Sequence, residues 1–223
     1  MNFTETLTFL ENLTENNSSE WVRNNRTAYD SNRKAVLAMT SKLLDEVSAF
    51  DHSIEEAHFK PGDCMMRQNR DIRFSKDKAP YKTNCFVLIG KGGKKGKYAS
   101  YYFSIQPGGN SFAGGGAYSP APAELKTLKS EIIYNFDEWK EIVEDKKFLK
   151  TFPDGVLTPE SYVRIPKEYE EDSPAKGYLR MKGFFTKTDF SDKQMKGDDI
   201  VEKILTSFKQ VKPMLDFLNR SFS

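Results

Sequence analysis

The sequence has few of the residues that build metal centres, disulfides or membrane spans. Only two of its 223 residues are cysteines and only two are histidines. No apolar run reaches the roughly 18 residues that a transmembrane helix needs. The first residues, MNFTETLTFLENLTENN, place acids and amides among the apolar positions, which is not typical of a secretory signal peptide. We therefore expect a cytoplasmic protein that has no membrane partner.

The spacing of the cysteines and histidines argues against metal and nucleophile chemistry. Cys64 and Cys85 form no CxxC pair, and His52 and His58 complete no zinc-binding pattern. We predict two free thiols in the core. Two histidines in a polar connector also make a Ser/His/Asp or Cys/His arrangement improbable. We expect no metal and no cofactor, and the sequence leaves open whether the protein is an enzyme.

The order of the hydrophobic patterns predicts the fold class. Helical spacing dominates the first 50 residues, short β-branched or aromatic runs fill positions 63 to 118, and helical patterns return from Ser119 onward. Such an order predicts an α+β fold, in which a mostly antiparallel sheet from the middle of the chain packs against N-terminal and C-terminal helices. The length suits one domain, so we predict a single domain over residues 1–223.

Several element boundaries follow from local signals. Helices are expected to begin near Asn17, at Ser119 with Pro120, at Asp137 and near Asp198, and Pro213 is expected to break or kink the last helix. A one- or two-turn helix is expected around positions 175–181. Three or four strands are expected in the middle of the chain, in the runs DCMMRQNR (63–70), TNCFVLIG (83–90), YASYYFSIQP (98–107) and SFAGGGAY (111–118).

Two glycine-rich stretches invite a phosphate-binding interpretation. The first, GKGGKKGK (90–97), matches neither common phosphate-loop motif and lies between strand-like runs, so we predict a solvated hairpin loop. The second, PGGNSFAGGGAYSP (107–120), leaves two alternatives open. Its three consecutive glycines indicate either tight backbone packing or a loop that approaches a ligand.

The charge is unevenly distributed, although the formal net charge is only +2. Residues 60–97 hold eleven Lys and Arg against three acids, a net +8, which leaves −6 for the rest of the chain. The densest part, RQNRDIRFSKDKAPYKTN (67–84), interleaves basic residues with aromatic residues. A local basic surface of this kind can hold an anion.

The same segment carries a resemblance to a known family. The run from Arg70 to Lys82 fits RDxRFSKDKxPYK, and the chain here resembles the family called Domain of Unknown Function 2461. The resemblance extends to the early helix with Trp21, to YYFSIQPGGNSFAGGGAYSP and to VRIPKEYEEDSPAKGYLRMKGF, where Glu168 occupies a position at which the family would have glycine. It implies a compact protein, with no established activity and no catalytic residues to carry over.

Three hypotheses for the basic segment stay open at this point. The first is a binding site for a small anion, a phosphate ester or a carboxylate, because Arg and Lys donate to such groups and Tyr can stack or donate. The second is nucleic-acid binding. The third is purely structural, with Arg70 and Arg73 paired to Asp71, Asp77 or other carboxylates. The candidate ligand-binding residues are Arg70, Arg73, Lys78, Tyr81, Lys82 and Tyr102.

Overall fold

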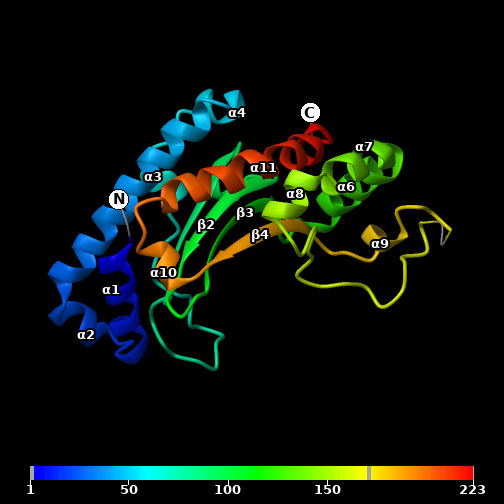
Figure 1. Cartoon of the computed structure of the whole chain (residues 1–223). Helices are drawn as coiled ribbons and strands as arrows, with labels where there is room; N and C mark the ends of the chain where they lie inside the picture. Colours follow the sequence, from blue (N-terminus) through cyan, green and yellow to red (C-terminus); the bar gives the residue numbers. More distant parts are fainter. Residues whose placement is uncertain (1–2, 170–171, 223) are drawn as a thin grey trace. The chain divides into compact units, whose positions relative to one another are not determined.

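The computed structural model describes residues 3–169 and 172–222 (Figure 1). The N-terminal helices are α1 (Thr4–Glu15), α2 (Ser19–Asn24), α3 (Arg26–Ser48), α4 (His52–Glu55) and α5 (Pro61–Cys64). The strands are β1 (Cys85–Ile89), β2 (Ser100–Ile105), β3 (Ser111–Ala117) and β4 (Phe184–Phe190), with a 3-10 turn η1 (Gly93–Lys95) between the first two. The later helices are α6 (Pro122–Tyr134), α7 (Phe136–Val143), α8 (Lys146–Thr151), α9 (Lys176–Leu179), α10 (Asp192–Met195) and α11 (Ile200–Arg220).

The strands form one four-stranded antiparallel sheet in the order β1-β2-β3-β4, flanked by the N-terminal and C-terminal helices. The predicted α+β class is therefore confirmed. The described chain divides into two compact units. The first holds residues 3–89, 102–113 and 189–205, and the second holds 90–101, 114–188 and 206–222. Strands β2, β3 and β4 and helix α11 each contribute residues to both units. The prediction of a single domain stays a prediction.

In the first unit, the apolar stripe of α1 forms part of the core. Leu7 and Leu10 are fully buried, and the ring of Phe3 lies 5.5 Å from that of Phe103 in β2. The backbone N–H of Phe3 also donates a 3.0 Å hydrogen bond to the carbonyl of Met195, at the end of α10. The first turn of the chain is thus fixed by a residue close to its end.

In the second unit, aromatic packing surrounds Trp139 of α7. Its ring lies 6.1 Å from Phe184 and 5.1 Å from Phe217. Lys129 of α6 is also buried, 2% exposed, and its ammonium donates a 2.7 Å hydrogen bond to the carbonyl of Leu179. Burial lowers the pKa of this ammonium. The rings of Tyr162 and Tyr169 lie over it at 4.7 and 5.5 Å, so the cation is partly compensated by aromatic faces.

Several predicted helix starts were wrong by one to three residues. The residue that caps α2 is Ser18, whose hydroxyl accepts from the Trp21 N–H at 3.1 Å. Asn17 does not cap this helix, because its side chain forms hydrogen bonds with the backbone of Tyr81. Helix α6 begins at Pro122 after Ala121, and not at Ser119 with Pro120. Helix α7 begins at Phe136, so that Asp137 lies in its first turn, where an acid favours the helix dipole.

Two further boundary predictions were also wrong. Residues 63–70 form no strand: α5 occupies their start, and isolated bridges pair Met65 with Val87 and Asn69 with Tyr81. Pro213 does not break the last helix, since α11 runs on to Arg220, and a kink at this proline stays a prediction. The apolar residues that follow this proline are buried, and their packing offsets the backbone hydrogen bond that proline removes. The expected short helix near 175–181 is α9.

Both glycine stretches have structural roles. GKGGKKGK joins neighbouring strands β1 and β2, as the hairpin prediction requires. Gly114 lies within β3, and a Cβ there would overlap the carbonyl oxygen of Thr186 and lie 2.8 Å from the Cα of Lys187. Tight packing against β4 therefore explains this glycine. Cys64 and Cys85 are free and buried, which confirms the prediction for the thiols.

Candidate functional site

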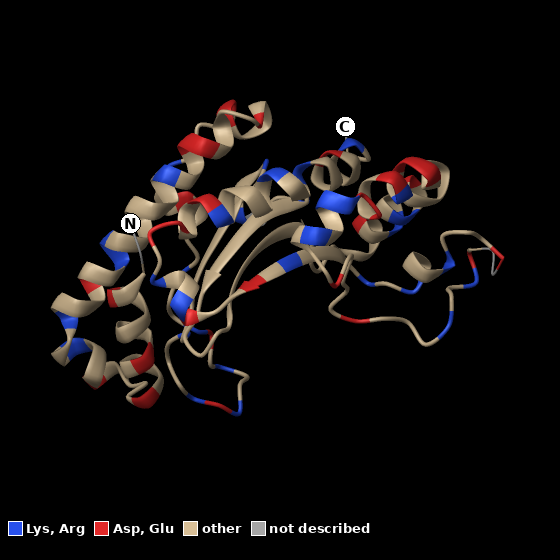
Figure 2. Ribbon diagram, in the orientation of Figure 1, with Lys and Arg blue, Asp and Glu red and all other residues tan. Residues whose placement is uncertain are grey.

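The candidate site is a long loop, here called the basic loop (residues 67–84), which precedes β1. Its two ends are joined by hydrogen bonds at the base. The Lys82 N–H donates to the Gln68 carbonyl at 2.8 Å, and the side-chain amide of Gln68 donates to the carbonyls of Lys82 and Asn84. The Arg70 N–H donates to the Pro80 carbonyl at 2.9 Å. Basic and acidic positions alternate along the projecting part (Figure 2).

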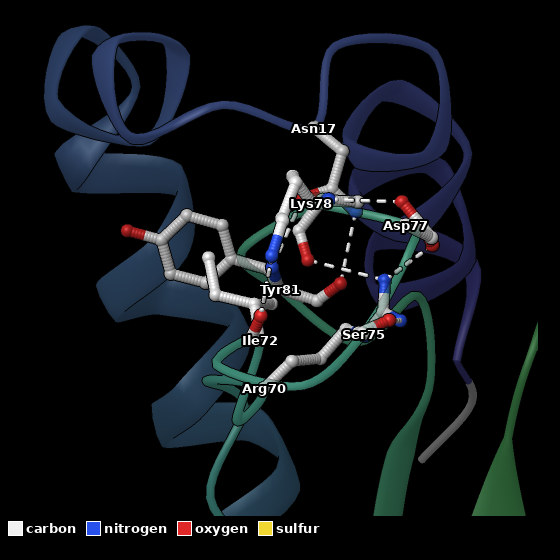
Figure 3. A network of polar contacts seen from close by, with 8 residues as sticks. Asn17, Arg70, Ile72, Ser75, Asp77, Lys78 and Tyr81 are labelled. Carbon is white, nitrogen blue, oxygen red and sulfur yellow. Dashed lines mark hydrogen bonds and ion pairs between the residues drawn. The ribbon is translucent and has the colours of Figure 1, made fainter.

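Asn17 attaches the loop to the connection between α1 and α2 (Figure 3). Its Nδ2 donates to the Tyr81 carbonyl at 2.9 Å, and its Oδ1 accepts from the Tyr81 N–H at 3.0 Å. The Tyr81 ring lies 6.4 Å from that of Tyr29 in α3. Tyr81 therefore serves as an anchor through both its backbone and its ring.

Arg70 holds the interior of the loop together. Its guanidinium, with 28% of the side chain exposed, forms an ion pair with Asp77 and donates to the Ala79 carbonyl at 3.1 Å. Asp77 also accepts from the Ala79 N–H at 2.9 Å. That backbone N–H and the Arg70 guanidinium lower the pKa of the Asp77 carboxyl. Arg70 thus has the pairing that the structural hypothesis anticipated.

Arg73 is paired in a different way, on the surface. Its guanidinium donates two hydrogen bonds to Asp71, at 3.0 and 2.7 Å. This contact lowers the pKa of the Asp71 carboxyl and raises the pKa of Arg73. The two side chains are 76% and 40% exposed, so water and salt screen the pair strongly. An incoming anion can therefore exchange with Asp71 at little cost.

The lysines of the loop are the least neutralised cations. The ammonium of Lys78 donates to the neutral carbonyl of Ile72 at 3.0 Å, which leaves its charge uncompensated (Figure 3). Within residues 3–169 and 172–222, neither Lys76 nor Lys82 has a hydrogen-bonding or ion-pair partner for its ammonium. Six cations against two acids give the loop a net charge of +4.

Tyr102, the tyrosine proposed from strand β2, and its neighbour Tyr101 both have packing roles. Tyr102 is 6% exposed, and its ring lies 6.0 Å from Phe86 and 6.1 Å from Phe112. Tyr101 is 1% exposed and packs on Phe208 of α11 at 5.2 Å. Adjacent residues of a strand point to opposite faces of the sheet, so these two rings do not share one pocket. The structure places Arg70, Arg73, Lys78, Tyr81 and Lys82 in the basic loop and Tyr102 within the sheet.

Sequence reasoning did not include Phe74 among the site residues. This side chain is 95% exposed, and the Arg73 guanidinium lies 5.8 Å from its ring centroid. The only signal in the sequence is its position between Arg73 and Lys76 within the polar run.

A pocket of about 700 Å³ in the second unit was also not anticipated. Acids predominate in its lining, and Arg220 is held by Glu131 and by both oxygens of Glu138 at 2.6 to 2.7 Å. The lining residues are Glu138, Glu141, Ile142, Asp145, Pro213, Asp216, Phe217 and Arg220. Its charge disfavours anions, so it does not compete with the basic loop for the proposed ligand.

Neither a metal-binding cluster nor a membrane-spanning helix occurs in the residues that the structure describes. In that part of the chain, the structure has no group of three or more His, Cys, Asp or Glu side chains that could hold a metal ion. None of the described helices is both long enough and apolar enough to cross a membrane.

Comparison with known proteins agrees with the motif in the basic loop. A family model described as "Conserved hypothetical protein (DUF2461)" matches residues 5–217. The chain belongs to this family. No curated protein and no solved structure matches the chain. Membership in DUF2461 therefore supports the resemblance of the whole chain but assigns no ligand, and the role of the basic loop depends on its geometry.

Proposed function

We propose that this DUF2461 protein binds an anionic ligand, carrying a phosphate ester or a carboxylate, at the basic loop. The observation that carries the proposal is the incomplete neutralisation of the loop's charge. Lys78 is bonded to a neutral carbonyl, Lys82 has no ion-pair partner among the described residues, and the partner of Arg73 is exposed. Uncompensated cations close together in the sequence of one loop attract an anion.

The residues of the loop have separable roles in this proposal. Arg70 and Asp77 keep the loop in shape, because their mutual contacts and those with Ala79 lie inside it. Lys78 and Lys82 supply ammonium donors at the site, and Arg73 supplies a planar donor pair once the ligand replaces Asp71. A rigid support combined with available donors is what a binding site requires.

The proposal is one of binding and includes no chemical step. The pKa values of the Asp71 and Asp77 carboxyls are lowered. Both groups therefore stay ionised at neutral pH and are weak proton acceptors there. We also propose a cytoplasmic setting, in keeping with two free, buried thiols.

The test is a titration with inorganic phosphate followed by NMR at constant ionic strength. We expect saturable shifts of the backbone amides of residues 70–82. The double variant K78M/K82M should weaken binding by about tenfold or more, because each ammonium gives a charge-assisted hydrogen bond. Lys34, an exposed lysine of α3, provides the matched control, and K34M should bind as the unaltered protein does. Shifts that do not saturate, or equal binding by K78M/K82M, would overturn the proposal.

A further inference from the structure

A large apolar ring projects from the most basic part of the chain. Phe74 is 95% exposed, whereas the other phenylalanines of the first unit are buried or half-buried. It is flanked in sequence by Arg73 and Lys76, and the Arg73 guanidinium lies 5.8 Å from the ring centroid. An exposed ring of this size retains apolar surface that a partner can cover.

We propose that the anionic partner of the basic loop is a single-stranded nucleic acid, whose bases stack on Phe74 while its phosphates contact the neighbouring cations. The inference rests on the proposed function, because the same cations would hold the phosphates. Aromatic platforms beside basic groups are how proteins bind single strands without reading their sequence. Arg73 would join the two contacts, since its guanidinium lies over the Phe74 ring, 5.8 Å from the centroid, and its donors suit a phosphate.

The shape of the site favours a polymer over a free small molecule. A small ligand needs a concave site that surrounds most of its surface, whereas Phe74 projects from a loop. A polymer gains from several shallow contacts, each with a phosphate or a base. In a duplex the bases already stack on each other, so only an unpaired strand leaves a base face free for Phe74. The loop's net charge of +4 selects against a basic partner.

The experiment compares a labelled oligothymidylate with an abasic sugar-phosphate strand of equal length, by fluorescence anisotropy. The unaltered protein should bind the base-bearing strand about tenfold more tightly, because stacking adds to the phosphate contacts. F74A and F74L should both lower this affinity to the level of the abasic strand. The leucine variant keeps an apolar side chain but has no ring. Y134A serves as the control, because Tyr134 of α6 is 88% exposed and outside the loop, and it should change neither affinity.

The outcomes separate the two proposals. Equal binding of both strands, with no effect of F74A, would overturn the stacking inference while phosphate binding at Lys78 and Lys82 stands. Loss of strand binding in K78M/K82M together with loss in F74A supports the inference. A protein that showed phosphate-induced NMR shifts but bound neither strand would also overturn it. Tighter binding to phosphatidylserine vesicles than to the oligothymidylate, sensitive to F74A, would assign the loop to a membrane surface and reject the nucleic-acid partner.

Discussion

The side chain of Asn17 binds the backbone of Tyr81 through both its oxygen and its nitrogen, at 3.0 and 2.9 Å. This arrangement copies the exchange of hydrogen bonds between paired strands. It joins the short connection between α1 and α2 to the C-terminal part of the basic loop, 64 positions further along the chain. The position of the loop therefore depends on a residue outside it.

Replacing Asn17 with alanine should loosen the loop. The variant N17A leaves the Tyr81 N–H and carbonyl without their partner, and we expect the free energy of unfolding to fall by about 1 to 3 kcal/mol. Urea denaturation measures the loss, and hydrogen exchange at Tyr81 should accelerate. The neighbouring Asn16 is a matched control, because its exposed side chain donates only to the carbonyl of Asn12. Equal effects of N16A and N17A would contradict the anchoring role.

The two arginines of the family motif should differ in their effect on stability. R70M removes the hydrogen bonds that a guanidinium only 28% exposed donates to Asp77 and to the Ala79 carbonyl, so its urea midpoint should fall. R73M removes a pair that is exposed on both sides, and its midpoint should be unchanged within error. Denaturation of both variants in the same buffer decides the point. If R73M were the more damaging change, Arg73 could not be the exchangeable donor proposed above.

Gly114 should not tolerate even one additional carbon. In G114A the new methyl group meets the backbone of Thr186 and Lys187, which cannot move aside as a side chain can. We expect a loss of about 1 to 3 kcal/mol in the free energy of unfolding, since overpacking forces the strands apart. G177A is the comparison, because no atom lies within 4 Å of a Cβ added at Gly177. Calorimetry should show a much lower Tm for G114A only.

The burial of Cys85 should make the free energy of unfolding fall in alkaline solution. Burial raises the pKa of its thiol to about 11, from an ordinary value of 9.0, with a weaker opposing effect from the hydrogen bond that Asn32 donates. Between these two pH values the unfolded chain loses the proton first, so the folded state becomes less stable as the pH rises. C85A should remove this part of the pH dependence. In the native protein below pH 9, neither buried thiol should react quickly with Ellman's reagent, whereas both should react in denaturant.

Thermal unfolding should show one transition despite the two compact units. Strands β2, β3 and β4 and helix α11 each belong in part to both units, so melting one unit would break the elements of the other. Differential scanning calorimetry should give a van't Hoff enthalpy equal to the calorimetric enthalpy. Two resolved transitions would show that the units fold independently.

The sequence predicted the helices and strands, because hydrophobic periodicity controls them. It missed the interactions that depend on residues far apart in the chain. The apolar stripes of α1 and α11 gave the helices, and the alternation in β1 and β2 gave the strands. Asn17 is a residue type that often caps helices. Its partner Tyr81 lies far along the chain, so no local signal could show that Asn17 does not cap the helix. The pairing of Arg70 with Asp77 is local, and for that reason it was among the alternatives that the sequence offered.

The exposure of single side chains was the property that the sequence predicted least well. Phe74 and Phe86 are the same residue type within one short stretch, yet one is 95% exposed and the other packs against Tyr102. Lysine is a residue type expected at the surface. Lys129 is nevertheless 2% exposed, because a later segment of the chain, which includes Tyr162, covers it. Both results depend on where distant segments lie, which periodicity does not encode.

The hydrogen bond from Phe3 to Met195 has a consequence for synthesis of the chain. Synthesis runs from the N-terminal side, so helix α1 is made before the carbonyl that fixes its first turn, which follows about 190 residues later. Until then the backbone N–H of Phe3 lacks its native acceptor. The start of helix α1 therefore cannot reach its native hydrogen bonding until the segment that holds Met195 has been synthesised.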